Sequence, residues 1–453
     1  MAKNRSHFIC QNCGATYSKW AGKCDNCGEW NTLVEEIPQD DTVAKNAIAR
    51  GMVSGKKLDI ASIDSIRISD QDDRLDTGFS ELDIVLGGGI LSGSVSLLAG
   101  QPGIGKSTIL MQICSNIANQ NKKVLYVSGE ESASQVKMRA VRLGAKSNTL
   151  SFASSTSGND IAKTIEQNDF DLVIIDSIQT LSLAEISSAP GTVSQVSNCG
   201  NLIIRAAKAT DTAVIIVGHV TKNGTLAGPK VLEHLVDVVL NFEGDRYGGF
   251  KTVRAVKNRF GSTRELAIFE MEESGLREVQ NPSEALLAER QNNDGSVILA
   301  TMEGNRPILV EIQALVNNTN FGYPKRTASG FDLNRLNLLI AVLEKRTRLK
   351  LQDKDVFINV VGGLKLKDNA ADLAICMAIA SAAAGRKLSD NLVVFGEVGL
   401  GGEIRSCIAP DRRIAEAKKI GFKNAIAPAT IKDKFVFPVK DLRTALVKYM
   451  NNK

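Results

Sequence analysis

The sequence predicts an α/β protein built on a parallel sheet, with a small metal-binding module before it and a further domain after it. Three observations lead to this fold class. A glycine-rich loop joins an apolar run to a helical pattern, more apolar runs alternate with helical segments, and four cysteines lie in the first 30 residues. Strands that alternate with helices favour a parallel sheet covered by helices.

The glycine-rich loop at residues 100–108 satisfies the P-loop pattern G-x4-G-K-[ST]. The apolar run at residues 95–99 predicts a buried strand before it, and the apolar spacing at residues 109–113 predicts a helix after it. Free N–H groups and the positive end of the helix dipole meet at such a junction and bind anions. The residues expected to surround the phosphates of ATP are Gly100, Gln101, Pro102, Gly103, Ile104, Gly105, Lys106, Ser107 and Thr108.

Within this loop, Lys106 is expected to reach the β- and γ-phosphates, and Ser107 to bind Mg²⁺. Further buried strands are predicted at residues 123–128, 171–176 and 213–219, each of them a run of mostly apolar residues. Asp176 ends the second of these strands and is expected to hold the hydration shell of the same Mg²⁺. Ligands of parallel sheets bind at the carboxyl ends of strands, so these residues should meet.

ATP hydrolysis needs a group that orients or deprotonates the attacking water. Glu130 and Glu131 follow the strand at residues 123–128, and we expect Glu130 to have this role. The alternative is that the two carboxylates cap a helix that starts near Ser132. His219 has two equal interpretations, a contact to the γ-phosphate or a polar residue that merely ends its strand.

The cysteine module contains two Cys-x-x-Cys pairs, Cys10 with Cys13 and Cys24 with Cys27. Four thiolates at this spacing favour one tetrahedral Zn²⁺ over a harder cation. Disulfides or a redox pair explain the doubled pattern less well. Gly14 and Gly28 follow the pairs where a tight turn needs positive φ. The only two tryptophans fall in this module. They either pack over the metal site, which we expect, or stack on a base.

Length and composition are those of a folded protein with two or three domains. The 453 residues are 43% hydrophobic and 23% charged, with 55 Lys and Arg against 50 Asp and Glu. No run approaches the ~20 apolar residues of a membrane span, and the first residues lack the apolar core of a signal peptide. We therefore expect a cytoplasmic protein without a membrane partner, whose net charge of +5 permits nucleic-acid binding without arguing for it.

Two motifs make the resemblance specific. Residues 75–90, which begin Leu-Asp-Thr-Gly-Phe-Ser, resemble the entry segment of RecA-like recombinases, and residues 257–261 read Lys-Asn-Arg-Phe-Gly. The latter matches the KNRFG motif of the bacterial RadA (Sms) family of DNA repair and recombination ATPases. The resemblance extends over nearly the whole chain and implies a RecA-like core followed by an α+β Lon-protease-like domain. The predicted domains are 1–34, zinc finger; 35–74, linker; 75–281, ATPase; and 282–453, Lon-like.

The family resemblance implies that Lys257 contacts nucleotide across a subunit boundary in a hexameric ring, with Arg259 as a second candidate. Such cations stabilise charge on the transferred phosphoryl group. It also implies DNA-binding loops at residues 184–191 and 221–230. Lys222, Lys230 and Arg259 are therefore the candidates for nucleic-acid contact. Without the resemblance, these cations would be read as solvated surface residues.

The C-terminal domain resembles Lon-type protease domains at residues 395–405, the Gly-Glu segment. That family uses a serine nucleophile activated by a lysine base. Motif matching places Ala371 at the serine position and Arg413 at the lysine position. Alanine has no nucleophile, and arginine keeps its proton at neutral pH. The sequence therefore predicts a domain without peptidase activity.

The leading functional prediction is a DNA-dependent ATPase of recombinational repair. The resemblance implies a homo-hexameric motor on single-stranded and branched DNA, which promotes branch migration alongside a RecA-type recombinase. The alternatives are a Lon-type ATP-dependent protease, which Ala371 and Arg413 argue against, and a non-translocating RecA-like ATP switch. Stimulation of ATP hydrolysis by DNA would separate the motor from the switch.

Overall fold

The computed structural model describes residues 7–10, 14–30, 32–36, 62, 74–219, 231–244, 250–319 and 322–450. Its compact part divides into two units, each described by itself below. The first contains residues up to 243, 254–263 and 273–276, and the second contains 244–253, 264–272 and 277–453. Between residues 243 and 277 the chain therefore passes back and forth between the two units. The predicted domain limit between residues 281 and 282 stays a prediction. Of the predicted linker at 35–74, only residues 35, 36, 62 and 74 are described.

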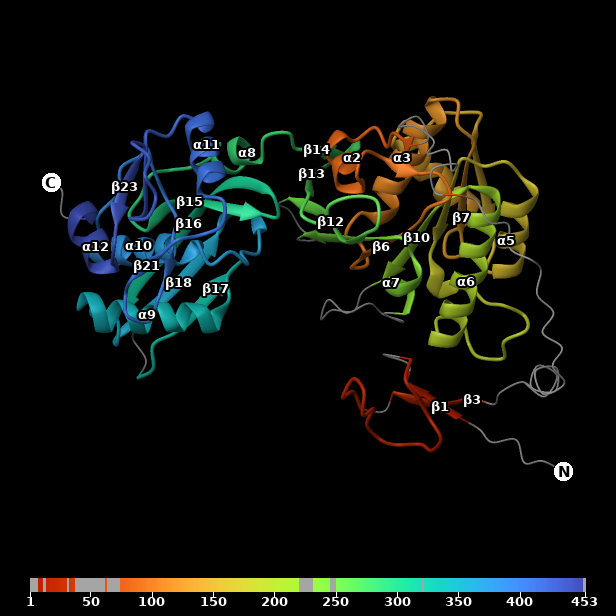
Figure 1. The fold of residues 1–453 in the computed structure, drawn as a ribbon, viewed down its shortest axis with the longest axis horizontal. Coiled ribbons are helices and arrows are strands. Elements are labelled where there is room, and N and C mark those ends of the chain that lie inside the picture. Colours follow the sequence, from red (N-terminus) through yellow and green to blue (C-terminus); the bar gives the residue numbers. More distant parts are fainter. Residues whose placement is uncertain are drawn as a thin grey trace. The chain divides into compact units, whose positions relative to one another are not determined.

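The N-terminal module is a small antiparallel sheet with strand order β2-β1-β3 (Figure 1). The strands are β1 (His7–Cys10), β2 (Thr16–Tyr17) and β3 (Leu33–Glu36). Such a short sheet cannot bury a sizeable core, so the module depends on another source of folding energy. The cysteines of this module are described below.

The first unit contains the predicted parallel sheet (Figure 1). Six strands run parallel in the order β11-β6-β10-β9-β7-β8, within a nine-stranded sheet that also contains β12, β13 and β14. The strands are β6 (Val95–Gly100), β7 (Val124–Ser128), β8 (Leu150–Ser154), β9 (Leu172–Asp176), β10 (Ala213–His219), β11 (Val238–Gly244), β12 (Lys251–Asn258), β13 (Leu266–Glu272) and β14 (Gly275–Glu278). The predicted strands at 95–99, 123–128, 171–176 and 213–219 are thereby confirmed to within one residue at each end.

Helices cover the inner strands β6, β7, β9 and β10, which are buried, whereas the edge strand β8 has no buried residue. Apolar residues of α5, α6 and α7 form one cluster with alternate residues of β6, β7, β9 and β10. The helices of the unit are α2 (Ser80–Leu86), α3 (Lys106–Asn119), α4 (Ala133–Arg142), α5 (Gly158–Gln167), α6 (Val193–Thr210) and α7 (Val231–Leu235). A short hairpin of β4 (Arg74–Leu75) and β5 (Ile90–Leu91) flanks α2.

The second unit has its own seven-stranded mixed sheet with order β17-β18-β16-β15-β19-β22-β23 (Figure 1). The strands are β15 (Ser296–Glu303), β16 (Arg306–Asn318), β17 (Arg326–Ser329), β18 (Lys354–Val360), β19 (Leu392–Val394), β22 (Asn424–Pro428) and β23 (Val436–Val439). The hairpin β20 (Glu397–Val398) and β21 (Ile404–Arg405) lies outside it. The helices are α8 (Pro282–Leu287), α9 (Leu333–Thr347), α10 (Ala371–Ala384), α11 (Pro410–Ile420) and α12 (Leu442–Met450). The mixture of parallel and antiparallel pairs confirms an α and β domain distinct from the parallel core.

The sequence of α10, the central helix of this second unit, is rich in alanine because the helix is buried. All eleven residues from Ala371 to Ser381 are buried, so the helix is enclosed on every side. Small side chains let neighbouring elements approach such a helix closely. Within the described residues, no helix is both long and apolar enough to cross a membrane.

Candidate nucleotide and metal sites

The P-loop joins β6 to α3 as predicted. Gly103 and Gly105 have φ of +78° and +120°, in the left-handed region that favours glycine. A Cβ on Gly103 would meet no atom within 4 Å, so the loop leaves open space there. Helix α3 starts at Lys106 after Gly105, without a side-chain cap on its first N–H groups. Uncapped amides beside open space fit a phosphate group.

The Lys106 side chain is turned back onto its own loop. Its ammonium donates to the backbone oxygens of Gly100 at 2.8 Å and Gln101 at 3.1 Å, and lies 3.3 Å from His219 Nδ1. Burial disfavours the charged form and lowers the pKa of Lys106 to about 8, although Asp176 and Glu130 oppose this shift. A phosphate placed in the loop would give this ammonium a stronger acceptor than the two carbonyls.

Two hydroxyls bind the carboxylate at the end of β9. Ser107 Oγ donates to Asp176 Oδ2 at 2.8 Å, and Tyr126 OH donates to the same oxygen at 2.6 Å. The predicted magnesium pair, Ser107 and Asp176, is therefore in direct contact. A hydroxyl and a carboxylate next to a phosphate site are oxygen ligands of the kind that Mg²⁺ takes.

The two adjacent glutamates have different surroundings. Glu131 forms a bidentate ion pair with Arg139, at 2.6 and 2.5 Å. Glu130 Oε1 instead accepts from Ser177 Oγ at 2.6 Å and lies 3.2 Å from His219 Nε2. Ser132 and Gln135 cap α4 by themselves through a reciprocal capping box, so neither glutamate is needed there.

His219 connects Lys106 to Glu130 through its two ring nitrogens. A charged ammonium can only donate, so Nδ1 accepts from Lys106 and the ring proton is on Nε2, facing Glu130. Burial alone would raise the pKa of Glu130, but the hydrogen bonds from Ser177 and His219 and the charge of Lys106 outweigh it. The pKa of Glu130 therefore lies below its usual value, which keeps the side chain an acceptor at neutral pH.

The KNRFG segment contains the last two residues of β12, Lys257 and Asn258, and the bend that follows them. Lys257 donates three hydrogen bonds to backbone oxygens where α7 ends: Glu233 at 2.8 Å, His234 at 3.2 Å and Val236 at 2.7 Å. Burial and the nearby Arg259 lower the pKa of Lys257. Its ammonium is thus occupied within its own chain as the C-terminal cation of a helix.

Asp237 holds the second cation of this segment. The carboxylate is buried and binds Arg259 at 3.2 Å, Lys208 at 2.8 Å and the N–H of Val95 at 3.0 Å. Burial would raise the pKa of Asp237, but the bonds from Lys208 and Val95 and the charge of Arg259 lower it overall. Since Val95 begins β6, Asp237 links the KNRFG turn to the strand that leads into the P-loop.

The cysteines of the N-terminal module converge. The sulfur atoms of Cys10, Cys24 and Cys27 all lie within 4.8 Å of one another. Burial opposes ionisation of Cys24, but hydrogen bonds from Tyr17 and from the backbone lower its pKa to about 6. Thiolates are the form that ligates zinc, so this cluster fits Zn²⁺.

The two turns of the cysteine module repeat each other. The N–H of Gly14 donates to the Cys10 carbonyl at 2.9 Å, and that of Gly28 donates to the Cys24 carbonyl at 2.8 Å. The two glycines have φ of +75° and +76°, which confirms the predicted positive φ. The tryptophans were expected to pack over the site; instead Trp20 and Trp30 are 59% and 67% exposed, and the expectation is wrong. The short strands and two tight turns of this module leave too small a core to cover two indole rings.

The Lon-like positions lie around one aspartate. Arg413, in α11, is fully buried and binds Asp368 at 2.7 Å, while the Asp368 carbonyl accepts the N–H of Ala371 at 3.1 Å. Arg335, one of the basic residues of this domain, forms an ion pair with the buried Asp372. Both arginines are therefore engaged inside the domain.

Three predicted site residues, Cys13, Lys222 and Lys230, lie outside the described residues. Four residues of the site were not predicted from the sequence: Tyr126, Arg139, Ser177 and Asp237. Ser177 directly follows Asp176, and its place after a strand end was the available signal. The others give no local signal, because each meets its partner only through the arrangement of strands and helices.

Three sequence families match parts of the chain. One is described as an AAA domain and matches residues 64–225, one as a rubredoxin metal binding domain and matches 8–35, and one as subunit ChlI of Mg-chelatase and matches 336–431. The chain is also 48% identical to the DNA repair protein RadA of Bacillus subtilis, over 97% of this chain and 95% of the relative. The corresponding protein of Aquifex aeolicus is 43% identical, over 98% and 99%.

The chain belongs to the RadA family of DNA repair proteins. The RadA protein of Halalkalibacterium halodurans is likewise 48% identical, over 94% of this chain and 93% of the relative. A crystal structure of the RadB recombinase aligns with 46% of this chain and all of its own, at 22% identity and a TM-score of 0.37. The identities to the RadA proteins confirm the expected family, and the family matches together with the parallel sheet confirm the expected fold class. This RadA family member has an ATPase-type core, a zinc-ribbon module and a C-terminal mixed domain.

Proposed function

We propose that this RadA family member is a DNA-dependent ATPase of recombinational repair. It acts as a hexameric ring that loads on single-stranded DNA and promotes branch migration of recombination intermediates alongside a RecA-type recombinase. The observation that supports hydrolysis best is the hydrogen-bonded chain from Lys106 through His219 to Glu130 beside the P-loop. The names of its relatives, all DNA repair proteins, support the DNA substrate.

Each residue of the site has a distinct role in this proposal. The P-loop amides and Lys106 bind the phosphates of ATP. Ser107 and Asp176 hold Mg²⁺, which neutralises charge on the phosphates when bound. Glu130 orients the attacking water, while Ser177 and His219 fix its Oε1 and leave Oε2 for that water.

A pair of variants tests the assignment of Glu130 over Glu131. Glu130→Gln should lower kcat by about 10²- to 10⁴-fold with ATP binding retained, because it loses the water-positioning acceptor. Glu131→Gln is the matched control, since it removes the ion pair to Arg139 and should leave kcat within a few-fold. The reverse order of the two kcat values would give the role to Glu131.

The proposed contact of Lys257 with a neighbouring subunit's nucleotide requires its ammonium to leave the three carbonyls at the end of α7. Lys257→Ala should keep ATP binding and lose hydrolysis. Turnover measured in mixed rings of wild-type and variant subunits tests the shared site. A strictly linear fall with the variant fraction would contradict it.

DNA binding is proposed for Lys222 and Lys230, with Arg259 as a further cation. Single-stranded DNA should stimulate ATP hydrolysis, and binding should weaken steeply with salt as counterions are released. Replacing Lys222 and Lys230 by alanine should reduce the salt slope and the DNA-stimulated rate while basal turnover stays near normal. A labelled three-strand branch-extension assay then tests the motor itself. Hydrolysis that DNA does not stimulate would favour an ATP switch.

The C-terminal domain is proposed to have no peptidase activity. Ala371 offers no nucleophile, and Arg413 is bound in an ion pair. Unfolded casein should therefore remain intact while ATP is consumed. Cleavage that a nearby serine substitution abolishes would contradict this assignment.

A further inference from the structure

Tyr126 occupies an unusual place between the magnesium pair and a cavity. It is the middle residue of β7 and is 1% exposed. In the sheet, Tyr126 lies opposite Ile174 of β9, and Asp176 is the next residue of β9 on the same face. The length of a tyrosine therefore allows its hydroxyl to reach Asp176 Oδ2, at 2.6 Å.

Both hydroxyls at this carboxylate use one oxygen. Ser107 and Tyr126 donate to Oδ2 of Asp176, which leaves Oδ1 for the hydration shell of a metal ion. A Ser107 hydroxyl that binds a magnesium ion does so through an oxygen lone pair and keeps its O–H to donate to Asp176. Tyr126 is the second donor to the same oxygen, and the two together fix the orientation of a carboxylate that is only 7% exposed.

We propose that Tyr126 is a positioning residue for the magnesium site, acting through Asp176. The inference rests on the proposed ATPase function and extends it to a residue without contact to nucleotide. Fixing the ligand's orientation before the ion arrives reduces the cost of binding it, so loss of the hydroxyl should weaken magnesium binding rather than nucleotide binding.

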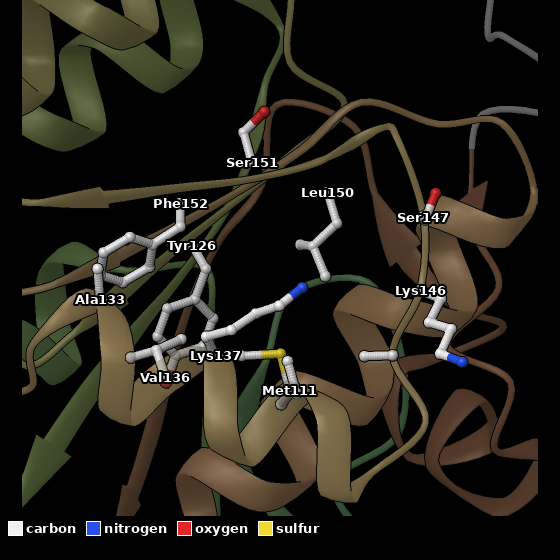
Figure 2. A pocket seen from close by; sticks show the side chains of 12 residues that line it. Met111, Tyr126, Ala133, Val136, Lys137, Lys146, Ser147, Leu150, Ser151 and Phe152 are labelled. Carbon is white, nitrogen blue, oxygen red and sulfur yellow. The ribbon is translucent and has the colours of Figure 1, made fainter.

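The packing around Tyr126 makes the hydroxyl bond important. The ring lines a cavity of about 320 Å³ together with Met111 of α3, Val136 of α4 and Phe152 of β8 (Figure 2). Tyr126 is nevertheless only 1% exposed, so neighbouring atoms enclose the ring and restrain it. The enclosed ring holds its hydroxyl against Asp176 Oδ2, and the hydrogen bond passes this fixed orientation on to the carboxylate.

Tyr126→Phe tests this proposal because it removes the hydroxyl and keeps the ring. The Mg²⁺ concentration for half-maximal ATP hydrolysis should rise about tenfold, and kcat at saturating Mg²⁺ should stay within about threefold of wild type, as expected for the loss of one charge-assisted hydrogen bond. Binding of ADP without metal should be unchanged. Electron paramagnetic resonance of free Mn²⁺ should show about tenfold weaker Mn²⁺ binding to the ADP complex, independently of turnover.

The matched control is Phe152→Leu, which alters the wall of the same cavity without touching Asp176. It should leave the Mg²⁺ and Mn²⁺ requirements at the wild-type values. An unchanged metal requirement in Tyr126→Phe, with only a lower melting temperature, would overturn the proposal and leave the hydroxyl a purely structural role. If wild-type protein shows no metal-dependent hydrolysis, the proposed function itself fails, and the Mn²⁺ measurement still decides the role of Tyr126.

Discussion

Neutralising Asp368 should destabilise the second unit more than neutralising its partner, Arg413. The two residues form a buried ion pair at 2.7 Å, and Arg413 is fully buried. We compare Asp368→Asn, which keeps the shape of the side chain, with Arg413→Met, which keeps an unbranched apolar stem. The double variant completes a thermodynamic cycle for the pair.

The difference in the cost to stability follows from the hydrogen-bond partners that each residue keeps when the other residue of the pair is replaced. Without the charge of Asp368, the Arg413 guanidinium stays buried with no anionic partner from Asp368 and keeps the carbonyls of Ala300 at 2.6 Å and Ile408 at 3.0 Å and the face of the Phe395 ring. Breaking a buried pair in this way costs about 3–5 kcal/mol. Without Arg413, the Asp368 carboxylate keeps three donors, the Thr301 hydroxyl and the N–H groups of Met302 and Ala370. That loss should cost about 1–3 kcal/mol.

Hydrogen exchange is the suitable assay, because both tryptophans lie in the cysteine module and their fluorescence does not report on the second unit. The slowest amides of β15 and α10 measure the free energy of opening of this unit. In Asp368→Asn their exchange should accelerate by about two to three and a half powers of ten, at 1.4 kcal/mol per tenfold. Retained ATP binding would verify that the first unit is folded.

The pH dependence gives a second check on the same pair. Burial would raise the pKa of Asp368, but the hydrogen bond and charge of Arg413 outweigh it, so the pKa lies below its usual value. The stability that this lowering contributes is fully present above about pH 4 and is lost as the pH falls through the folded-state pKa. The difference between wild type and Asp368→Asn should therefore shrink at pH 3. Equal costs for the two single variants, or strict additivity in the double variant, would refute the reasoning.

Three further predictions concern the first unit and the cysteine module. Cys24→Ser should lose the single zinc ion expected per chain, because three thiolates leave the tetrahedral shell incomplete; metal analysis that finds iron, or unchanged zinc, would contradict this. Because burial lowers the pKa of Lys106 to about 8, the nucleotide-free protein loses this charge as the pH rises through 8, and ATP affinity should fall above it. Calorimetry in two buffers should detect proton uptake on ATP binding at pH 8.5 and almost none at pH 6.5; equal uptake at both would argue against the shift. Asp237→Asn should lower the free energy of unfolding by about 1–3 kcal/mol and slow ATP hydrolysis, because it releases Arg259 and Lys208 beside the P-loop strand. The control is Asp169→Asn, at an exposed ion pair, which should change the free energy of unfolding by less than about 1 kcal/mol.

Local pattern was enough to predict the P-loop, its flanking strand and helix, and the paired cysteines. A P-loop combines fixed glycines with a strand before it and a helix after it, so sequence spacing contains most of its geometry. The strands β7, β9 and β10 could be predicted from their apolar runs for a similar reason. Strands buried on both faces of a parallel sheet need continuous apolar sequence.

Tertiary structure alone decided the contacts of side chains whose partners are distant in the chain. Glu130 and Glu131 are adjacent carboxylates in the sequence. They differ because Arg139 of α4 binds Glu131, while Ser177, directly after β9, and His219, at the end of β10, contact Glu130. Tyr126 is a similar case, because its contact with Asp176 depends on the register of β7 against β9. Strand order and register set these contacts. Both result from burying the whole sheet at once, and no local stretch of sequence specifies them.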